Sequence, residues 1–263
     1  MMEQMFYKFD GAGNDFVVID NRDGRFQADA TQIERLCHRR FGVGADGLMT
    51  LDAAPAGYDF EMRYYNSDGR PGSMCGNGGR CIAAFAHVLG LGTRLRFMAY
   101  DGPHEADIVT WDPQARLGIV RLGMQSVPTS GIRRCLEGWF LDTGSPHYVQ
   151  RVAGLEHYDV VGQGRRLRHL QQEFPEGTNV DFIEDLPDGR LAVRTYERGV
   201  EDETWACGTG VTAAALVSGN CRLVTRGGDF KVDFEASDSA FNHIFLTGPV
   251  ALNFTGTWTF SAQ

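Results

Sequence analysis

No run of apolar residues in the 263-residue sequence approaches the roughly 20 residues that a membrane-spanning helix needs. The first residues, Met1-Met2-Glu3-Gln4, carry neither the basic region nor the apolar core of a secretory signal, so we expect a cytoplasmic protein. Basic residues are also fewer than acidic ones, because 34 acidic and 25 basic residues give a net charge of −9. This balance argues against a nucleic-acid partner and against docking on an anionic membrane.

The six cysteines form no CxxC pair, and the closest two, Cys75 and Cys81, have five residues between them. This spacing disfavours a zinc site. A disulfide framework is not expected in a reducing compartment. Unpaired cysteines are usually buried as small apolar side chains. We expect that environment for four of the six, which are Cys37, Cys81, Cys135 and Cys221.

The other two cysteines each precede a glycine-rich corner and a run of helix formers. The first corner is Met74-Cys75-Gly76-Asn77-Gly78-Gly79-Arg80, and the second is Ala206-Cys207-Gly208-Thr209-Gly210-Val211. A cysteine at a helix N-terminus meets unpaired N–H groups and the positive end of the helix dipole, which favour its thiolate. The same N–H groups can bind a carboxylate. The two corners predict a pair of thiols acting on one substrate, and two buried thiols without a function are the alternative.

The order of parts along the chain repeats at an offset of 132 residues, the separation of Cys75 and Cys207. A duplication of this length predicts two similar units, each with strands around a helix. Residues 123–138 hold proline and glycine without a clear period, so we expect a linker there. The offset also relates Gly76 and Gly78 to Gly208 and Gly210, and Asp15-Phe16-Val17 to His147-Tyr148-Val149.

Hydrophobic patterning predicts mainly short strands between turns. Strand, turn and strand are expected at 5–20 and again at 139–149, with helices at 30–40 and after each cysteine corner. Further strands are expected at 48–51, 60–65, 95–100, 105–110, 117–122, 191–196, 231–234, 244–246 and 251–260.

Two thiols in a duplicated fold suit one kind of reaction. Inverting a carbon centre requires a group that removes a proton from one face and a second group that delivers a proton to the other. A thiol and a thiolate can both exist near neutral pH when the thiol pKa is tuned below about 8.5.

With these residues in view, the sequence resembles the diaminopimelate epimerases over essentially its whole length. This family interconverts LL- and meso-diaminopimelate without cofactor or metal. The resemblance rests on Gly11-Ala12-Gly13-Asn14-Asp15-Phe16, Tyr65-Asn66-Ser67-Asp68-Gly69, Cys75-Gly76-Asn77-Gly78-Gly79-Arg80-Cys81, Gly144-Ser145-Pro146-His147, Asn179, Tyr196-Glu197-Arg198-Gly199 and Ala206-Cys207-Gly208-Thr209-Gly210.

The resemblance implies an α+β fold of two pseudo-symmetric lobes, each a curved β-sheet or barrel wrapped around a central helix. The N-terminal lobe would be residues 1–123, with the C-terminal strand 251–263 returning to it, and the C-terminal lobe would be residues 124–250. It also implies an enzyme of lysine and cell-wall precursor biosynthesis, with a homodimer as the assembly to test.

Residue roles follow from the same resemblance. Cys75 and Cys207 would be the two catalytic bases, and His147 and Glu197 would tune the thiol pKa values. The α-carboxylate would bind at Gly76-Asn77 and Gly208-Thr209. The remaining substrate contacts would come from Asn14, Asn66, Ser145, Asn179, Glu197 and Arg198.

Two positions depart from the commonest family pattern. Gly47 stands where the family often has Gln, and Ser145 stands where it often has Asn before Pro-His. A serine hydroxyl still donates and accepts a hydrogen bond, but with a shorter reach, and glycine offers only its backbone. We therefore expect altered contacts at the distal end of the substrate and unaltered proton transfer.

Two alternatives stay open at this point. One is an enzyme similar to the proline and hydroxyproline racemases, which share the cysteine–glycine corners. The other is a redox protein in which Cys75 and Cys207 form a reversible disulfide. Taken alone, His147 could also belong to the core, Glu197-Arg198 to a solvated loop, and the asparagines to turns.

Overall fold

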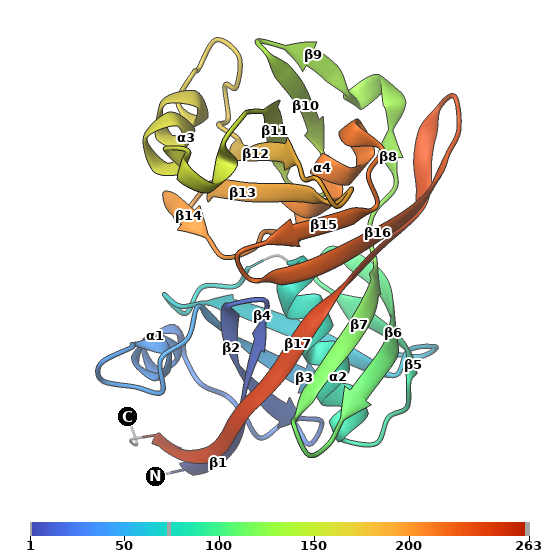
Figure 1. The fold of residues 1–263 in the computed structure, drawn as a ribbon. Coiled ribbons are helices and arrows are strands. Elements are labelled where there is room, and N and C mark those ends of the chain that lie inside the picture. The colour runs from blue at the N-terminus through green and yellow to red at the C-terminus, as the bar shows by residue number, and fades with distance from the viewer. Residues whose placement is uncertain (1, 73–74, 261–263) are drawn as a thin grey trace. The chain divides into compact units, whose positions relative to one another are not determined.

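The computed structural model describes residues 2–72 and 75–260, so Met74 and the last three residues of the expected returning strand 251–263 lie outside the described residues. The chain divides into two compact units (Figure 1). Unit 1 comprises Met1–Leu122 and Pro249–Gln263, and unit 2 comprises Gly123–Gly248. Within the described residues no helix is both long and apolar enough to cross a membrane.

Unit 1 is a barrel around one helix. Its strands are β1 (Met2–Gly11), β2 (Asn14–Asn21), β3 (Gly47–Asp52), β4 (Phe60–Asn66), β5 (Arg94–Ala99), β6 (Gly102–Asp112) and β7 (Leu117–Gly123), together with part of β17 (Ala240–Phe260). Each strand pairs with the next, and β17 pairs with both β7 and β1, which closes the described barrel at eight strands. The β2–β3 and β4–β5 pairs are parallel.

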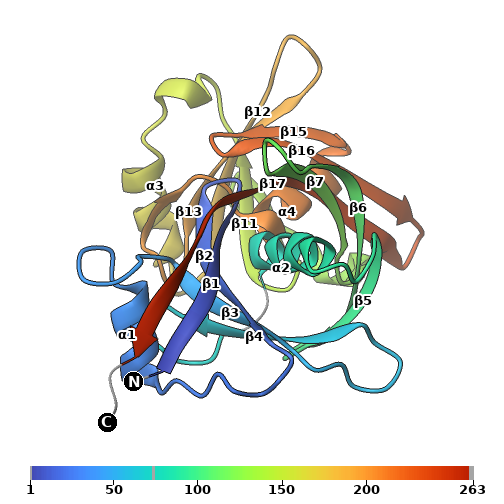
Figure 2. The ribbon, with the colours of Figure 1, turned by 90° about the horizontal axis from the view of Figure 1, so that it is seen from below.

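Helix α2 (Gly76–Val88) fills this barrel, and strands surround it in Figure 2. The side chains from Cys81 to Ala86 are completely buried. Small side chains let the strands approach, and Phe85 packs its ring against Tyr7 and Phe9 of β1. Helix α1 (Ala30–Cys37) begins at a capping box between Asp29 and Gln32.

Unit 2 repeats this plan around helix α4 (Gly208–Ser218). Its hairpin, β10 (Gly138–Asp142) with β11 (Pro146–Arg151), is followed by η2 (Leu155–His157), α3 (Val160–Arg168) and β12 (Asn179–Asp185), which runs parallel to β11. The remaining elements are β13 (Leu191–Glu197), β14 (Asp202–Thr204), β15 (Arg222–Thr225), β16 (Gly228–Ala236) and the first part of β17. Helices α2 and α4 begin 132 residues apart, as do β2 and β11.

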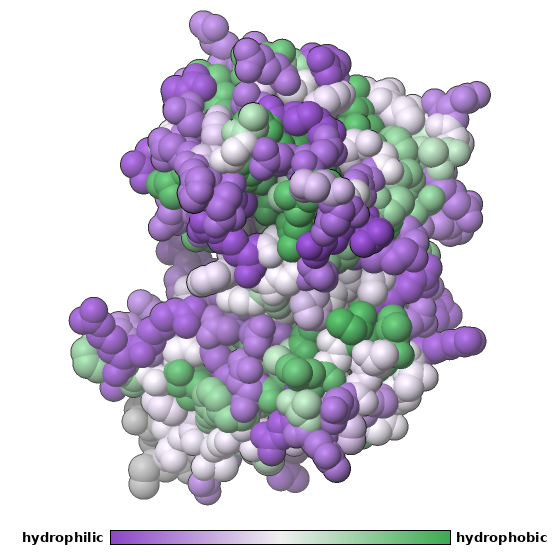
Figure 3. Space-filling model, viewed as in Figure 1, coloured by the Kyte–Doolittle hydropathy of each residue, from purple (hydrophilic) through white to green (hydrophobic). Residues whose placement is uncertain are grey.

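The predicted α+β fold of two related units, each with strands wrapped around a central helix, is confirmed. Most expected strands are present, and the two expected at 244–246 and 251–260 are parts of the single 21-residue strand β17. Elements α3, β12 and β15 lie where no element is expected from the sequence. Over α3 the surface is strongly hydrophilic (Figure 3), consistent with its exposed Arg165 and Arg166.

The expectation of a linker at 123–138 is wrong. That stretch contains β8 (Val127–Pro128), the short 3-10 helix η1 (Thr129–Gly131) and β9 (Arg133–Cys135). Strand β8 pairs with β17 and β9 pairs with β10, so the segment is part of the sheet of unit 2. Strands of two and three residues are too short to show a hydrophobic period, which explains why the pattern resembles a linker.

Candidate active site

Cys75 is the N-cap of α2 in unit 1. Its backbone is extended, and its Sγ accepts a hydrogen bond of 3.2 Å from the N–H of Gly78. Glycine suits that position, because a Cβ on residue 78 would lie 3.3 Å from this sulfur and 3.2 Å from Sδ of Met49. The corner thus holds a half-buried thiol at the N-terminus of a helix, with the N–H of Gly78 directed at its sulfur.

Two asparagines and a buried arginine surround Cys75. Oδ1 of Asn14 lies 4.0 Å from Sγ of Cys75 and 3.5 Å from Nδ2 of Asn77. The fully buried Arg80 donates to the carbonyl oxygen of Gly76 at 3.0 Å and to Oδ1 of Asn77 at 2.9 Å. Burial lowers the pKa of Arg80 to about 10, which leaves a cation one helical turn from the thiol at neutral pH.

A charged network fixes Asn14. Its Nδ2 donates to Asp46 at 2.6 Å, and Arg39 bridges Asp46 at 2.6 Å and Asp15 at 2.7 Å. Lys8, which is buried, also pairs with Asp15. Burial opposes ionisation of Asp15, but the hydrogen bonds from Arg39 and Lys8 outweigh it and lower the pKa of Asp15 to about 2. Asn14 is therefore held by a carboxylate that Arg39 ties to Asp15.

Cys207 is the N-cap of α4 in unit 2 and is almost fully buried. Its Sγ lies 3.3 Å from the hydroxyl oxygen of Thr209. Burial raises the pKa of the Cys207 thiol well above its ordinary value, and the carboxylates of Glu197 and Asp181 raise it further. The hydrogen bond between Sγ and the Thr209 hydroxyl and the hydrogen bond from the N–H of Gly210 act in the opposite direction but are outweighed.

His147 lies beside this thiol in a polar cluster facing α4. Its Nδ1 is 2.6 Å from Oδ2 of Asp181, and its Nε2 is 2.9 Å from Oγ1 of Thr209 and 3.0 Å from Oγ of Ser145. The His147 ring is completely buried. Oγ of Ser145 is also 3.0 Å from Oγ1 of Thr209, so three side chains meet at one point next to Cys207.

Asn179 joins this cluster to the following loop. It stands opposite His147 in the parallel register of β11 and β12, and its Nδ2 donates to the carbonyl oxygen of Pro146 at 3.0 Å. Its Oδ1 accepts from the backbone N–H of Arg198 at 2.8 Å. Asn179 thus fixes the backbone at both ends of the cluster.

A family model described as diaminopimelate epimerase matches residues 6–123 and 139–252. The diaminopimelate epimerase of Chlorobaculum tepidum is 43% identical over 95% of this chain and 99% of its own length. That of Flavobacterium psychrophilum is 42% identical over 95% and 98%. The chain belongs to the diaminopimelate epimerase family. It is thereby a member of a family of amino-acid epimerases, which are isomerases.

Solved structures support the fold of this epimerase family member. A probable proline racemase from Agrobacterium radiobacter superposes with a TM-score of 0.72 at 14% identity, covering 99% of this chain and 93% of the other. A hydroxyproline epimerase from Agrobacterium vitis, with bound trans-4-hydroxy-L-proline, gives 0.67 at 16%, covering 97% and 92%.

In this diaminopimelate epimerase family member, the expected site residues are divided between the two units. Asn14, Gly76 and Asn77 surround Cys75, and Asn66 lies at the end of β4, opposite Gly47 in the register of β3 and β4. In unit 2 hydrogen bonds join most of the expected residues near Cys207, and Glu197 acts on the thiol through its charge. These expected residues are Ser145, His147, Asn179, Glu197, Arg198, Gly208 and Thr209.

Asp181 also lies near Cys207 but is not among the residues expected from the sequence. It is a fully buried carboxylate, two residues after Asn179 and on the same face of β12. The available signal is an acidic residue inside the otherwise apolar run Val180-Asp181-Phe182-Ile183. Of the four cysteines expected to be buried, Cys37, Cys81 and Cys135 are buried, while Cys221 is half-buried.

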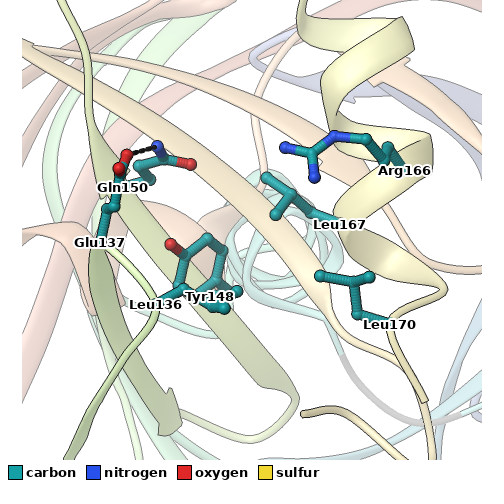
Figure 4. A pocket seen from close by; sticks show the side chains of 7 residues that line it. All are labelled: Leu136, Glu137, Tyr148, Gln150, Arg166, Leu167 and Leu170. Carbon is teal, nitrogen blue, oxygen red and sulfur yellow. Dashed lines mark hydrogen bonds between the residues drawn. The ribbon is translucent and has the colours of Figure 1, made fainter. Parts of the chain in front are cut away.

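A separate cavity of about 270 Å³ lies on the other face of β11 (Figure 4). Tyr148 and Gln150 line it from the strand, and Arg166 and Leu167 line it from α3. Successive residues of a strand point to opposite faces, so Tyr148 faces away from the His147 cluster. Burial raises the pKa of Tyr148 to about 12, which keeps its phenol neutral.

Proposed function

We propose that this protein interconverts LL- and meso-diaminopimelate, with Cys75 and Cys207 as the two acid/base groups. In one direction Cys75 removes the α-proton as a thiolate and Cys207 delivers a proton as a thiol, and in the other direction the roles are exchanged. The observation that carries the proposal is that each cysteine is the N-cap of the central helix in its unit, at equivalent places in a repeat. Inversion requires two such groups, one for each face of the carbon.

The glycine corners would hold the α-carboxylate. Backbone N–H groups at Gly76-Asn77 and Gly208-Thr209 stand at helix N-termini, where N–H donors and the helix dipole stabilise an anion. The same donors would stabilise the negative charge that develops as the α-proton leaves. We assign Asn14, Asn66, Ser145, Asn179, Glu197 and Arg198 to the remainder of the substrate.

His147 and Glu197 would set the protonation state of the thiols. Glu197 bears directly on Cys207, because its carboxylate raises the pKa of that thiol. His147 reaches Cys207 through the hydroxyl of Thr209. Cofactor and metal have no assigned role in this reaction.

Isotope exchange in heavy water tests the reaction and its substrate. Purified protein is incubated in D₂O with LL-diaminopimelate and, separately, with L-proline, and deuterium at the α-carbon is followed by NMR. We expect exchange and epimerisation of diaminopimelate and none of proline. Exchange of proline alone would contradict the proposed substrate and favour the racemase-like alternative.

Cysteine variants test the two-base mechanism. Cys75→Ser and Cys207→Ser should each remain folded and lose at least about 10²-fold in kcat, the usual contribution of a general acid or base. Cys221→Ser is the matched control, since that half-buried cysteine has no assigned role. Retention of epimerase activity in either active-site variant would refute the mechanism and favour a redox role for the cysteine pair.

The setting of the enzyme belongs to the same proposal. Diaminopimelate epimerisation places the protein in lysine and cell-wall precursor biosynthesis, and we assign it to the cytoplasm as a homodimer. Light scattering coupled to gel filtration tests the assembly, because the chain mass is 29.1 kDa. A mass near 58 kDa, twice the chain mass, is expected.

A further inference from the structure

A continuous line of hydrogen-bonded side chains leads from a buried carboxylate to Cys207. Oδ2 of Asp181 is 2.6 Å from Nδ1 of His147, and Nε2 of His147 is 2.9 Å from Oγ1 of Thr209. Oγ1 of Thr209 is in turn 3.3 Å from Sγ of Cys207. The side chains of Asp181 and His147 have no solvent exposure, so neither can exchange its partner for water.

The surrounding strands leave Asp181 little freedom. Its Oδ1 accepts a hydrogen bond of 2.6 Å from the hydroxyl of Thr195, which stands opposite it in the register of β12 and β13. On the helix side, a Cβ at residue 210 would come within 2.3 Å of the same Oδ1, so only glycine fits there. Both carboxylate oxygens are therefore engaged, one by Thr195 and one by His147.

This arrangement fixes the His147 tautomer. An ionised carboxylate only accepts hydrogen bonds, so Nδ1 carries the hydrogen and Nε2 presents its lone pair to Thr209. The Thr209 hydroxyl can then donate to Nε2 while its oxygen accepts from the thiol of Cys207. Oγ of Ser145 lies 3.0 Å from both Nε2 of His147 and Oγ1 of Thr209. A route from Cys207 through Thr209 and then the Ser145 hydroxyl would therefore also end at Nε2.

We propose that Asp181 is a positioning residue that acts through His147 and Thr209 on the protonation of Cys207. The S–H proton of Cys207 passes to Oγ1 of Thr209 as the hydroxyl proton passes to Nε2 of His147. The products are the Cys207 thiolate, an intact Thr209 hydroxyl and an imidazolium paired with the Asp181 carboxylate. The consequence for turnover rests on the proposed function.

The charges around Cys207 explain why a proton on His147 would favour the thiolate. Burial and the carboxylates of Glu197 and Asp181 all raise the pKa of the Cys207 thiol, so they disfavour an isolated thiolate. A proton retained on His147 places a positive charge between Asp181 and Cys207. Asp181 thus opposes the thiolate by its own charge but supports it through the imidazolium.

The direct charge of Asp181 and its action through His147 predict opposite changes in the rate at which Cys207 is alkylated. The full-length protein and its Asp181→Asn variant are treated with iodoacetamide at pH 7 without substrate, and modification of the Cys207 peptide is timed by mass spectrometry. Direct charge alone predicts faster alkylation in the variant, because a negative charge is removed. Action through His147 predicts slower alkylation, by roughly tenfold or more, because the imidazolium loses its partner. Equal or faster alkylation in the folded variant would overturn the proposal.

Thr209 provides an independent pair of variants. Thr209→Ser keeps the hydroxyl and should alkylate at Cys207 within a few-fold of wild type. Thr209→Val keeps the shape and removes the hydroxyl, so it should slow alkylation as Asp181→Asn does. Equal rates in the two Thr209 variants would also overturn the proposal, even if Asp181→Asn proved too unstable to purify.

The alkylation assay separates this inference from the proposed function. If diaminopimelate is the substrate, Asp181→Asn should lower kcat by roughly 10²-fold with little change in KM. If the wild-type protein fails to epimerise diaminopimelate but the variant alkylates slowly, the proposed substrate is wrong and the role of Asp181 stands. If the wild type is active and alkylation is unchanged in the variant, the role of Asp181 is wrong and the epimerase function stands.

Discussion

Tyr64 occupies the space into which a side chain at Gly47 would project. A Cβ on residue 47 would lie 2.6 Å from Cε2 and 2.8 Å from the hydroxyl oxygen of Tyr64, and 2.6 Å from the carbonyl oxygen of Tyr65. Tyr64, on the neighbouring strand, therefore takes up space that a glutamine side chain at this position would need. Glutamine cannot simply be restored here.

The first prediction concerns stability at this position. Gly47→Ala should lower the free energy of unfolding by about 1–3 kcal/mol, because the Tyr65 carbonyl belongs to a paired strand and cannot move cheaply. Gly131→Ala is the control, since its Cβ would meet only Cγ of Pro128 at 3.6 Å. Urea unfolding measures both, and equal midpoints for Gly47→Ala and wild type would contradict the prediction. Gly47→Gln should be less stable than Gly47→Ala.

The second prediction concerns the charge beside Cys207. The Glu197 carboxylate raises the pKa of this thiol, so Glu197→Gln should lower it. The pH at which Cys207 becomes half-maximally reactive towards iodoacetamide should therefore move to a lower value. Glu235→Gln, at an exposed carboxylate of β16, should leave the profile unchanged. A shift to higher pH in Glu197→Gln would show that its charge does not act as proposed.

The third prediction concerns stability in acid. The pKa of Asp15 is lowered to about 2 in the folded protein, whereas an unfolded chain has a value near 4. Its stabilising contribution is complete above about pH 4 and is lost as the pH falls from about 4 to about 2. After allowance for partial solvent screening, we expect about 1–2 kcal/mol.

Asp15→Asn should therefore lose part of the acid dependence of its unfolding free energy between pH 5 and pH 2.5. The matched control is Asp23→Asn, because Asp23 and its partner Arg25 are both largely exposed. Urea unfolding over this pH series checks the difference. Parallel curves for Asp15→Asn and wild type would rule out the assigned role of the Lys8 and Arg39 pairs.

The fourth prediction concerns alkaline pH. Burial raises the pKa of the Cys37 thiol to about 12, while the thiol of an unfolded chain ionises near 8.5. Above about pH 8.5 the unfolded state releases a proton that the folded state keeps, so stability falls by up to about 1.4 kcal/mol per pH unit until about pH 12. Cys37→Ala should flatten this decline relative to wild type in urea unfolding at pH 8, 9 and 10. A slope identical to that of wild type would contradict it.

Much of the fold is predictable because its signals are local. The glycine corner before each central helix and the apolar strand of Phe16 to Ile19 each appear within a short window of sequence, and the 132-residue offset relates one window to another. Together they locate α2, α4 and the strands around them. The family motifs add the residues near each cysteine.

The remainder depends on contacts that a short window does not contain. Strand β8 forms because it pairs with β17, more than 100 residues later in the chain. Strand β9 forms because it pairs with β10, which follows it directly. Asp181 gains its role only when three strands bring His147 and Thr195 to its two oxygens. No local pattern distinguishes that aspartate from an ordinary buried ion pair.

Strand β17 also has a consequence for synthesis on the ribosome. The first strand of the protein pairs with the last, from Met2 opposite Phe260 to Asp10 opposite Ala251. Unit 1 therefore cannot close its barrel until residues 251–260 have been made, although most of its residues are translated before unit 2. Unit 2, complete at Gly248, has its whole sequence available earlier. Strand β1 must wait with an open edge, the kind of edge that can pair with another chain, until residues 251–260 leave the exit tunnel.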